Sequence, residues 1–353
     1  MTSALQREPT TDTPTAAHPF VSVVVPIRNE SDYISGCLNS ILQNDWPPEF
    51  MEVLVVDGSS TDDTVAQVMT IAVQDPRVRL LQNPKQVQTS AMNIGIREAQ
   101  GSIILRVDGH AEIEPDYIRR SATELMERPE CWCVGGVVET VNDTKIGRII
   151  AASTSCPVGV GNSQFRIGGA AGYADTVPFG GYWKWVFEKI GAYDEELARN
   201  EDDELNARVI ENGGKIFLNP EIRSRYFSRS TLQKLWKQYY QYGVCRIRTI
   251  QKRGSASFRY LIPMVFVLAV IMATGAAVVS PMLRPLSAGF GLLYLAGLLV
   301  GAVMVSRKTG LAGFLLSPLI FAILHFSYGI GSLFGILWFT VLGHRTLTHG
   351  LSR

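Results

Sequence analysis

Three side chains that can bind a cation follow a short apolar segment of the chain. The segment Ser102–Val107 is followed by Asp108, His110 and Glu112, which alternate with small residues. Alternate residues of an extended strand point to the same side, so the three side chains are expected to share one face. Two carboxylates and an imidazole at the end of a buried strand suit a divalent cation that holds a phosphate group. Taken alone, the segment favours the simpler interpretation of a strand that ends in a polar turn.

Two earlier apolar segments also end in polar side chains. Phe20–Ile27 is followed by Arg28 and Glu30, and Met51–Val56 is followed by Asp57. Helical patterns lie between these segments, and alternating strands and helices at this spacing predict a doubly wound α/β sheet. The carboxyl ends of parallel strands meet at one edge of the sheet, so we expect all these polar groups to form one site. Together they favour a site for a nucleotide phosphate.

The hydrophobic pattern also predicts the elements that carry these residues. Strands are predicted at 20–27, 51–56, 78–82, 102–107, 131–140 and 215–218, and helices at about 34–42, 64–73, 89–99 and 115–128. Residues 155–181 are rich in glycine and are expected to be irregular. No G-x-G-x-x-G follows the first strand and no G-x-x-x-x-G-K-[ST] occurs, which argues against a dehydrogenase or an ATPase.

A second acidic segment, Glu201–Glu204, precedes a helix that is predicted to end near Glu211. Acidic side chains stabilise the N-terminus of a helix, which is one explanation for the segment. Four acids in a row exceed what a helix end requires, and their repulsion suggests that one of them faces a cationic or reactive group. Both interpretations remain open on the spacing alone.

Charge is distributed unevenly along the chain. The net charge is +1, which argues against a nucleic-acid partner, and none of the 32 acidic residues lies beyond Glu221. Residues 230–258 are basic and carry aromatic and aliphatic side chains at helical spacing. This pattern predicts an interfacial amphipathic helix on an anionic membrane surface, with an ordinary packing helix as the alternative.

The rest of the chain is predicted to enter a membrane. Leu261–Ser280 and Leu286–Val305 are each long enough to span a bilayer, and Leu311–Leu342 is a third apolar stretch. Three or four spans are therefore expected in residues 259–353. Arg307 and Lys308 predict that the loop after the second span, and with it the domain that precedes the first span, is cytoplasmic.

Two further features agree with a cytoplasmic domain. The five cysteines form no C-x-x-C motif, which is typical of free thiols in a reducing compartment. Residues 1–18 are rich in Thr, Pro and Ala, and we expect a disordered tail without a signal peptide. The predicted localisation is the inner or plasma membrane, with several spans.

Seven motifs, taken together, resemble the family 2 inverting glycosyltransferases of GT-A fold. They are V-S-V-V-V-P-I-R-N-E (21–30), V-V-D-G-S-S-T-D-D-T (55–64), A-M-N-I-G-I (91–96), R-V-D-G-H-A-E (106–112), D-T-V-P-F-G-G (175–181), G-A-Y-D-E-E-L (191–197) and N-E-D-D-E-L (200–205). The chain is most similar to the membrane-attached branch with the succinoglycan-type exopolysaccharide enzymes. The resemblance implies a GT-A domain, Rossmann-like with a mixed central sheet, in residues 19–229.

The resemblance also implies roles for individual residues. The expected contacts to the donor nucleotide are Pro26, Arg28, Glu30, Asp57, Asp108 and Arg229. Asp108 and His110 occupy the positions of the D-x-D metal motif, with histidine in place of the second aspartate. This exchange favours Mn²⁺ relative to Mg²⁺, and Glu112 is expected as a third ligand. Asp202 matches the catalytic base.

The implied activity is inverting transfer of one sugar from a nucleotide-diphospho-sugar, with a UDP-sugar expected, to a polyprenyl-linked glycan during cell-surface polysaccharide synthesis. The Q-x-x-R-W motif of processive enzymes is not intact, since Gln238–Tyr242 stands in its place. This difference favours one transfer per encounter. The alternatives are a polyprenyl-phosphate glycosyltransferase, a non-catalytic nucleotide-sugar sensor and a nucleotidyltransferase.

Overall fold

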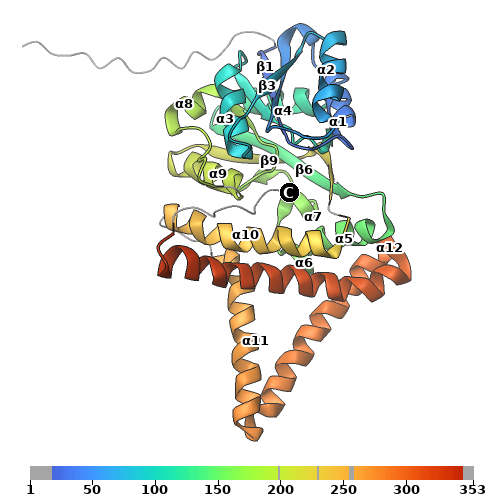
Figure 1. Ribbon diagram of the computed structural model, residues 1–353, viewed down its shortest axis with the longest axis vertical. Coiled ribbons are helices and arrows are strands. Elements are labelled where there is room, and N and C mark those ends of the chain that lie inside the picture. Colours follow the sequence, from blue (N-terminus) through green and yellow to red (C-terminus); the bar gives the residue numbers. More distant parts are fainter. Residues whose placement is uncertain (1–17, 198, 229, 254–257, 345–353) are drawn as a thin grey trace, which may run out of the picture.

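The computed structural model describes residues 18–197, 199–228, 230–253 and 258–344. Figure 1 shows an α/β domain, below it a layer of two long helices, and a helical hairpin that projects away from both. The predicted tail at 1–18 lies outside the described residues except for His18, whose ring packs edge-on against Trp46 at 5.2 Å between ring centres.

A single mixed sheet forms the centre of the α/β domain. Its strands are β1 (Val21–Ile27), β2 (Met51–Asp57), β3 (Val78–Gln82), β4 (Ile103–Arg106), β5 (Ala111–Ile113), β6 (Cys131–Val141), β7 (Gly172–Tyr173), β8 (Gly181–Trp183) and β9 (Lys215–Phe227). The spatial order is β3-β2-β1-β4-β8-β6-β9-β5, and β7 pairs with β9. Strands β1 to β4 are parallel, whereas β8 runs antiparallel to both β4 and β6. The predicted mixed α/β sheet is therefore confirmed.

Helices flank the sheet of this domain. They are α1 (Ile34–Leu42), α2 (Thr64–Gln74), α3 (Gln88–Glu98), α4 (Tyr117–Glu127), α5 (Lys145–Thr154), α6 (Pro157–Val160), α7 (Gln164–Ile167), α8 (Lys184–Ile190) and α9 (Glu201–Glu211). Of these, α5 and α6 also contact the long C-terminal helix Arg284–Gly335. All residues of β1 and β2 are buried, as the continuous apolar pattern of these strands predicts. The segment 155–181, expected to be irregular, contains the short elements α6, α7 and β7.

Beyond the domain, α10 (Leu232–Arg253) is followed by α11 (Ile262–Val279) and α12 (Arg284–Gly335), which continues as π-helical turns at Ile336–Val341. The long helix α12 bends at Gly310, whose φ of 67° is outside the helical range. In the described part of the chain, two helical segments are long and apolar enough to cross a membrane.

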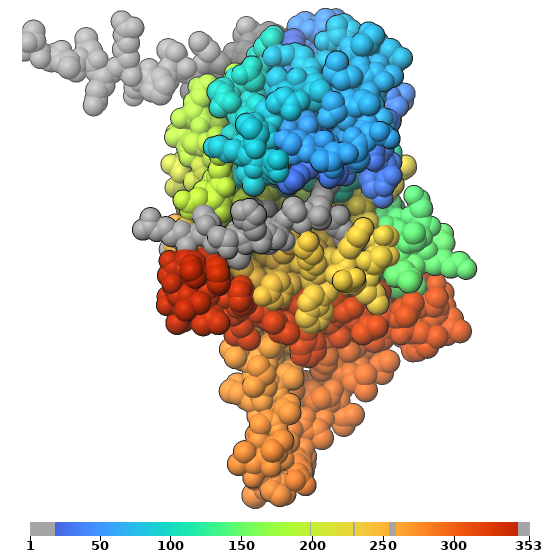
Figure 2. All heavy atoms as spheres, viewed as in Figure 1, coloured from blue at the N-terminus to red at the C-terminus, as the bar shows by residue number. Residues whose placement is uncertain are grey.

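The third apolar stretch has a different orientation from the first two. In Figure 1, α11 and the first part of α12 form the projecting hairpin, whereas the part after Gly310 returns beside α10. Figure 2 shows that the hairpin stands clear of the rest of the molecule. Large apolar side chains cover it and are exposed, among them Met272, Leu292 and Leu293. Such a surface is typical of contact with lipid.

Small residues allow α10 and the second part of α12 to approach closely. A Cβ atom added at Gly331 would lie 2.2 Å from the carbonyl oxygen of Tyr240, and one added at Gly243 would lie 2.1 Å from that of Tyr328. Gly335 lies one helical turn after Gly331, and a Cβ atom added there would be 2.8 Å from the carbonyl oxygen of Val244. Spacing of small residues by four positions is a common basis for helix contacts in apolar surroundings.

The first prediction concerns this contact. Gly331→Ala forces the two helix backbones apart, and overpacking of this kind costs about 1–3 kcal/mol. We expect a lower apparent melting temperature of the detergent-purified chain, followed by tryptophan fluorescence. Gly297→Ala on the hairpin is the matched control, because nothing lies within 4 Å of a Cβ at that position. Equal melting temperatures for the two variants would contradict the close contact.

Candidate functional site

A turn at the end of β4 separates two of the three predicted cation ligands from the third. The strand ends at Arg106, and the backbone N–H of Ala111 donates to the carbonyl oxygen of Asp108 at 2.9 Å before β5 begins. The backbone is therefore not extended from Asp108 to Glu112, as a shared face of the three side chains would require. Asp108 and His110 line a cavity, whereas Glu112 lies on β5.

Glu112 is directed toward helix α1. A Cβ atom added at Gly36 of that helix would lie 2.7 Å from the Glu112 carboxylate. Glu112 is not among the residues that line the cavity. In the described part of the chain, no three His, Cys, Asp or Glu side chains are clustered so that they could hold a metal ion. The expectation that Glu112 shares a face with Asp108 and His110 is thus corrected, because the turn reverses the side-chain direction.

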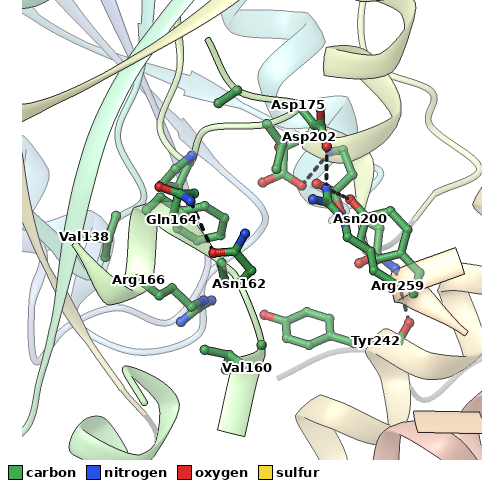
Figure 3. A pocket seen from close by; sticks show the side chains of 18 of the residues that line it. Val138, Val160, Asn162, Gln164, Arg166, Asp175, Asn200, Asp202, Tyr242 and Arg259 are labelled. Atoms are coloured by element: carbon green, nitrogen blue, oxygen red, sulfur yellow. Dashed lines mark hydrogen bonds and ion pairs between the residues drawn. The ribbon is translucent and has the colours of Figure 1, made fainter. Parts of the chain in front are cut away.

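The cavity has a volume of about 930 Å³ and extends from the end of β4 to the layer of α10 and α12. Its wall includes Asp108 and His110, Asp202 at the start of α9, and Tyr328 of α12. Figure 3 shows polar side chains from several elements directed into this space, with Asp202 and Asn200 on one side and Arg166 on the other. The structure therefore brings together residues that are more than 200 positions apart.

Arg106 is a central residue of the site that the sequence analysis missed. Its Nε lies 2.9 Å from Oδ1 of Asp108, and its Nη1 lies 3.1 Å from Oε1 of Glu201, while only 8% of the side chain is exposed. Burial by itself would raise the pKa of Asp108, but Arg106 and His110 outweigh it, so that the pKa lies below its usual value. One sign of this role is visible in the sequence, which is a single arginine at the end of an otherwise apolar strand.

His110 is paired with another predicted site residue. Its Nδ1 lies 3.2 Å from Oε1 of Glu30, and both side chains are buried. The Tyr226 ring packs edge-on against the imidazole at 4.7 Å. A histidine oriented by a carboxylate is the usual arrangement for a metal ligand. A carboxylate at Asp108 and an imidazole at His110 in one cavity therefore fit Mn²⁺ or Mg²⁺, with Glu30 behind the histidine.

The other predicted nucleotide contacts lie outside the cavity wall, at the ends of β1 and β2. Asp57 accepts hydrogen bonds from the N–H and hydroxyl of Ser60, at 3.2 and 2.6 Å. Arg28 Nη1 lies 3.5 Å from the carbonyl oxygen of Gln86, and Pro26 is buried within β1. Arg229 lies outside the described residues. Because β1, β2 and β4 are neighbours, these side chains are at the same sheet edge as Asp108.

The four acids at the start of α9 have different partners. Glu201 pairs with Arg106, Asp203 pairs with Arg246, and Glu204 pairs with Arg208 at 2.7 Å. In the described part of the chain Asp202 has no ion-pair partner, and its carboxylate accepts the N–H of Asp203 at 2.9 Å. Asp202 is therefore the acid of this segment that is left to face the cavity.

This position alters the acidity of Asp202. Burial is the main cause, and the negative charges of Glu201 and Asp203 add to it against the opposing effect of Arg106, so that the pKa of Asp202 rises to about 7. The pKa of Asp203 is shifted in the opposite direction. Burial would raise the pKa of Asp203, but its ion pair with Arg246 lowers it. The two neighbouring carboxyl groups thus ionise in different pH ranges.

Arg246 connects α9 to the helices below it. It donates to Asp203 and, at 3.1 Å, to the side-chain oxygen of Asn200, while its Nε lies 3.2 Å from the hydroxyl of Tyr328 on α12. Its guanidinium also lies over the ring of Tyr260, 3.9 Å from the ring centre. The start of α9 is therefore held against α10 and α12 through one buried cation.

Comparison with known proteins agrees with this architecture. Residues 22–177 match the family model "Glycosyl transferase family 2". One relative is the dolichyl N-acetyl-alpha-D-glucosaminyl phosphate 3-beta-D-2,3-diacetamido-2,3-dideoxy-beta-D-glucuronosyltransferase of Methanococcus voltae. The two chains are 27% identical over 321 residues, and this match covers 88% of this chain and 95% of that protein. This chain is also 29% identical over 245 residues to the succinoglycan biosynthesis protein ExoA of Rhizobium meliloti, covering 69% and 74% of the two chains.

A solved structure supports the fold. It is the mannosyltransferase PcManGT from Pyrobaculum calidifontis in complex with GDP-Man and Mn²⁺, with a TM-score of 0.63, 17% sequence identity, and coverage of 90% of this chain and 87% of that one. The resemblance inferred from the motifs is thus confirmed. Residues 22–177 are therefore a glycosyl transferase family 2 domain, and the chain is a glycosyltransferase with the GT-A fold.

Proposed function

We propose that this glycosyltransferase moves one sugar, with inversion, from a nucleoside-diphosphate sugar to a lipid-linked glycan during cell-surface polysaccharide synthesis. The main support is the single cavity that contains Asp108, His110 and Asp202 and continues to α11 and α12. The relatives support the same class, since one is named for succinoglycan biosynthesis and another for transfer to a dolichyl-phosphate-linked sugar. We retain a UDP-sugar as the proposed donor.

The donor diphosphate is proposed to bind at the end of β4. Asp108 and His110 would hold Mn²⁺ or Mg²⁺ there, and the ion, when bound, stabilises negative charge on the departing diphosphate. Pro26, Arg28, Glu30, Asp57 and Arg229 remain proposed contacts to the nucleotide, and Glu112 loses support as a ligand because it faces α1. Arg106 keeps Asp108 ionised and fixed in direction before the donor binds.

Asp202 is proposed as the general base. An attacking acceptor hydroxyl must lose its proton, and inversion requires that it approach from the side opposite the departing diphosphate. Asp202 lines the cavity without an arginine partner in the described chain, and a pKa of about 7 suits proton transfer near neutral pH. A phosphate acceptor would already be ionised and would need no base, so this arrangement favours a hydroxyl acceptor over a polyprenyl phosphate.

The membrane arrangement is also part of the proposal. We infer that the hairpin of α11 and the first part of α12 is inserted in the inner or plasma membrane, with the catalytic domain cytoplasmic. The exposed apolar side chains of the hairpin support insertion. The second part of α12 lies beside α10, so we propose that both lie at the membrane surface and that this stretch is not a third span. The altered motif at Gln238–Tyr242 supports transfer of a single sugar.

Replacing the proposed base tests the reaction. Asp202→Asn should lower kcat by about 10²–10⁴-fold, because general-base assistance is typically worth this much. Binding of nucleoside diphosphate with Mn²⁺ should change little. Asp143→Asn, at an exposed position, is the matched control and should keep its activity. Full turnover by Asp202→Asn would remove Asp202 from this role and would favour a phosphate acceptor.

The raised pKa of Asp202 predicts a pH dependence. The carboxylate must be ionised to accept a proton, so kcat/KM should be constant above about pH 7 and fall as the pH decreases below it. Asp203→Asn removes a neighbouring negative charge, which should move the acidic limb to lower pH. Initial rates between pH 5 and 9 measure both profiles. An acidic limb at the same pH in both proteins would be evidence against Asp202 as its origin.

The metal assignment can be tested by removal and replacement. EDTA should abolish transfer, and Mn²⁺ should restore it at lower concentration than Mg²⁺ because His110 is a nitrogen ligand. Asp108→Asn should raise the Mn²⁺ concentration needed for half activity, whereas Glu112→Gln should not, since Glu112 faces α1. Transfer that is insensitive to EDTA would exclude the metal site, and an equal effect of both variants would restore Glu112 as a ligand.

A further inference from the structure

The cavity changes in character from the sheet to the helices below it. At the sheet it is lined by the charged groups around Asp108, and at the opposite end by Val158, Ile262, Pro263 and Leu324 from α6, α11 and α12. Ile262, at the start of α11, is 52% exposed, so this end is next to the exposed apolar surface of the hairpin. One cavity thus joins a polar compartment to an apolar one.

An arginine lies within this cavity without a carboxylate partner. Three arginines of the wall are paired: Arg106 with Asp108, Arg246 with Asp203, and Arg259 with Asp175 at 3.0 Å. In the described part of the chain, the guanidinium of Arg166 on α7 has no ion-pair or hydrogen-bond partner and lies over the ring of Phe165, 5.4 Å from the ring centre. Figure 3 shows its guanidinium directed into the cavity, on the side where Tyr242 and Val160 lie.

The surroundings of Arg166 distinguish it from the other unpaired arginine of the wall. Arg199 also lacks a carboxylate partner in the described chain, but it is beside the acids of α9. Arg166 borders a small adjoining pocket together with Tyr226 and Tyr239. Tyr239 in turn packs against the apolar cluster that contains Phe321 and Leu324 of α12. Arg166 therefore lies where the polar compartment meets the apolar one.

Arg166 is half-buried, and a guanidinium that is partly shielded from water gains from a negative partner. No carboxylate in the described chain forms an ion pair with it. The planar donors of arginine match phosphate oxygens, and tyrosine hydroxyls can donate to the same oxygens. An anion bound here would be adjacent to apolar walls on one side and would face Asp202 on the other. A phosphate that carries a lipid chain has this combination of properties.

We propose that Arg166, together with Tyr239 and Tyr242, binds the phosphate next to the lipid chain of the acceptor. The assignment rests on the proposed function, because it takes the acceptor to be lipid-linked. The lipid chain would extend past Val158, Pro263 and Leu324 toward the hairpin, and the sugar hydroxyl to be glycosylated would lie toward Asp202. The donor diphosphate is the other source of the same chemistry, and the experiment separates the two.

The test measures binding to the detergent-purified full chain. The probe is farnesyl diphosphate in the presence of EDTA, which prevents binding through a metal ion, and farnesol is the uncharged comparison. Arg166→Ala should weaken farnesyl diphosphate binding about tenfold to hundredfold, as expected for loss of hydrogen bonds between charged groups, and should leave farnesol unaffected. Arg166→Lys should be intermediate, and Arg148→Ala, at an exposed position of α5, should bind like the unaltered chain.

Donor binding is measured in parallel with UDP and GDP in the presence of Mn²⁺. Arg166→Ala should retain the affinity of the unaltered chain within about twofold. Equal farnesyl diphosphate binding by Arg166→Ala and the unaltered chain would overturn the assignment, and so would a matching loss of UDP or GDP affinity, which would assign Arg166 to the donor. If the unaltered chain bound farnesyl diphosphate through Arg166 but neither nucleotide, the site would stand and the proposed donor reaction would fail.

Discussion

The buried guanidinium of Arg106 is the interaction on which the site depends. It joins Asp108 at the end of the sheet to Glu201 at the start of α9. Its position is fixed by the sheet itself, because Arg106 pairs in register with Val24 of β1. Carboxylates collected in a space with little water repel one another, and a paired cation is what allows them to remain ionised together. The helix that carries Asp202 is thereby attached to the end of β4, next to Asp108.

The same principle divides the acids of α9 into paired and unpaired groups. Glu201, Asp203 and Glu204 are each compensated by an arginine, from β4, α10 and α9 itself. Asp202 lies between compensated neighbours and has no ion-pair partner in the described chain, and its burial, with the negative charges of Glu201 and Asp203 added, raises its pKa. One side chain thus becomes chemically distinct within a run of similar residues. The difference between Asp202 and the other three acids follows from their ion pairs rather than from their place at the start of a helix.

The sequence predicted those parts of the site that depend on local pattern. The apolar strands and their polar ends identified the sheet edge, and the motif around Asp202 identified the second acidic group. Glu112 does not share the face of Asp108 and His110 as expected, because a turn at Asp108–His110 reverses the alternation, and such a turn leaves no strong local signal. Arg106, Arg166 and Arg246 were missed because their roles depend on residues far away in the chain, which only the tertiary structure brings near.

The apolar stretch Leu311–Leu342 also shows that local pattern does not predict tertiary contacts. Its composition is that of a span, but the bend at Gly310 and the close contact through Gly331 direct it beside α10. The layer that these two helices form is also one wall of the cavity, through Tyr242, Arg246 and Tyr328. The α/β domain and the helices that follow it are therefore not separable modules. A truncation before α10 would leave a domain whose cavity lacks the wall formed by α10 and α12. Fusion to a membrane segment of an unrelated protein would not restore that wall.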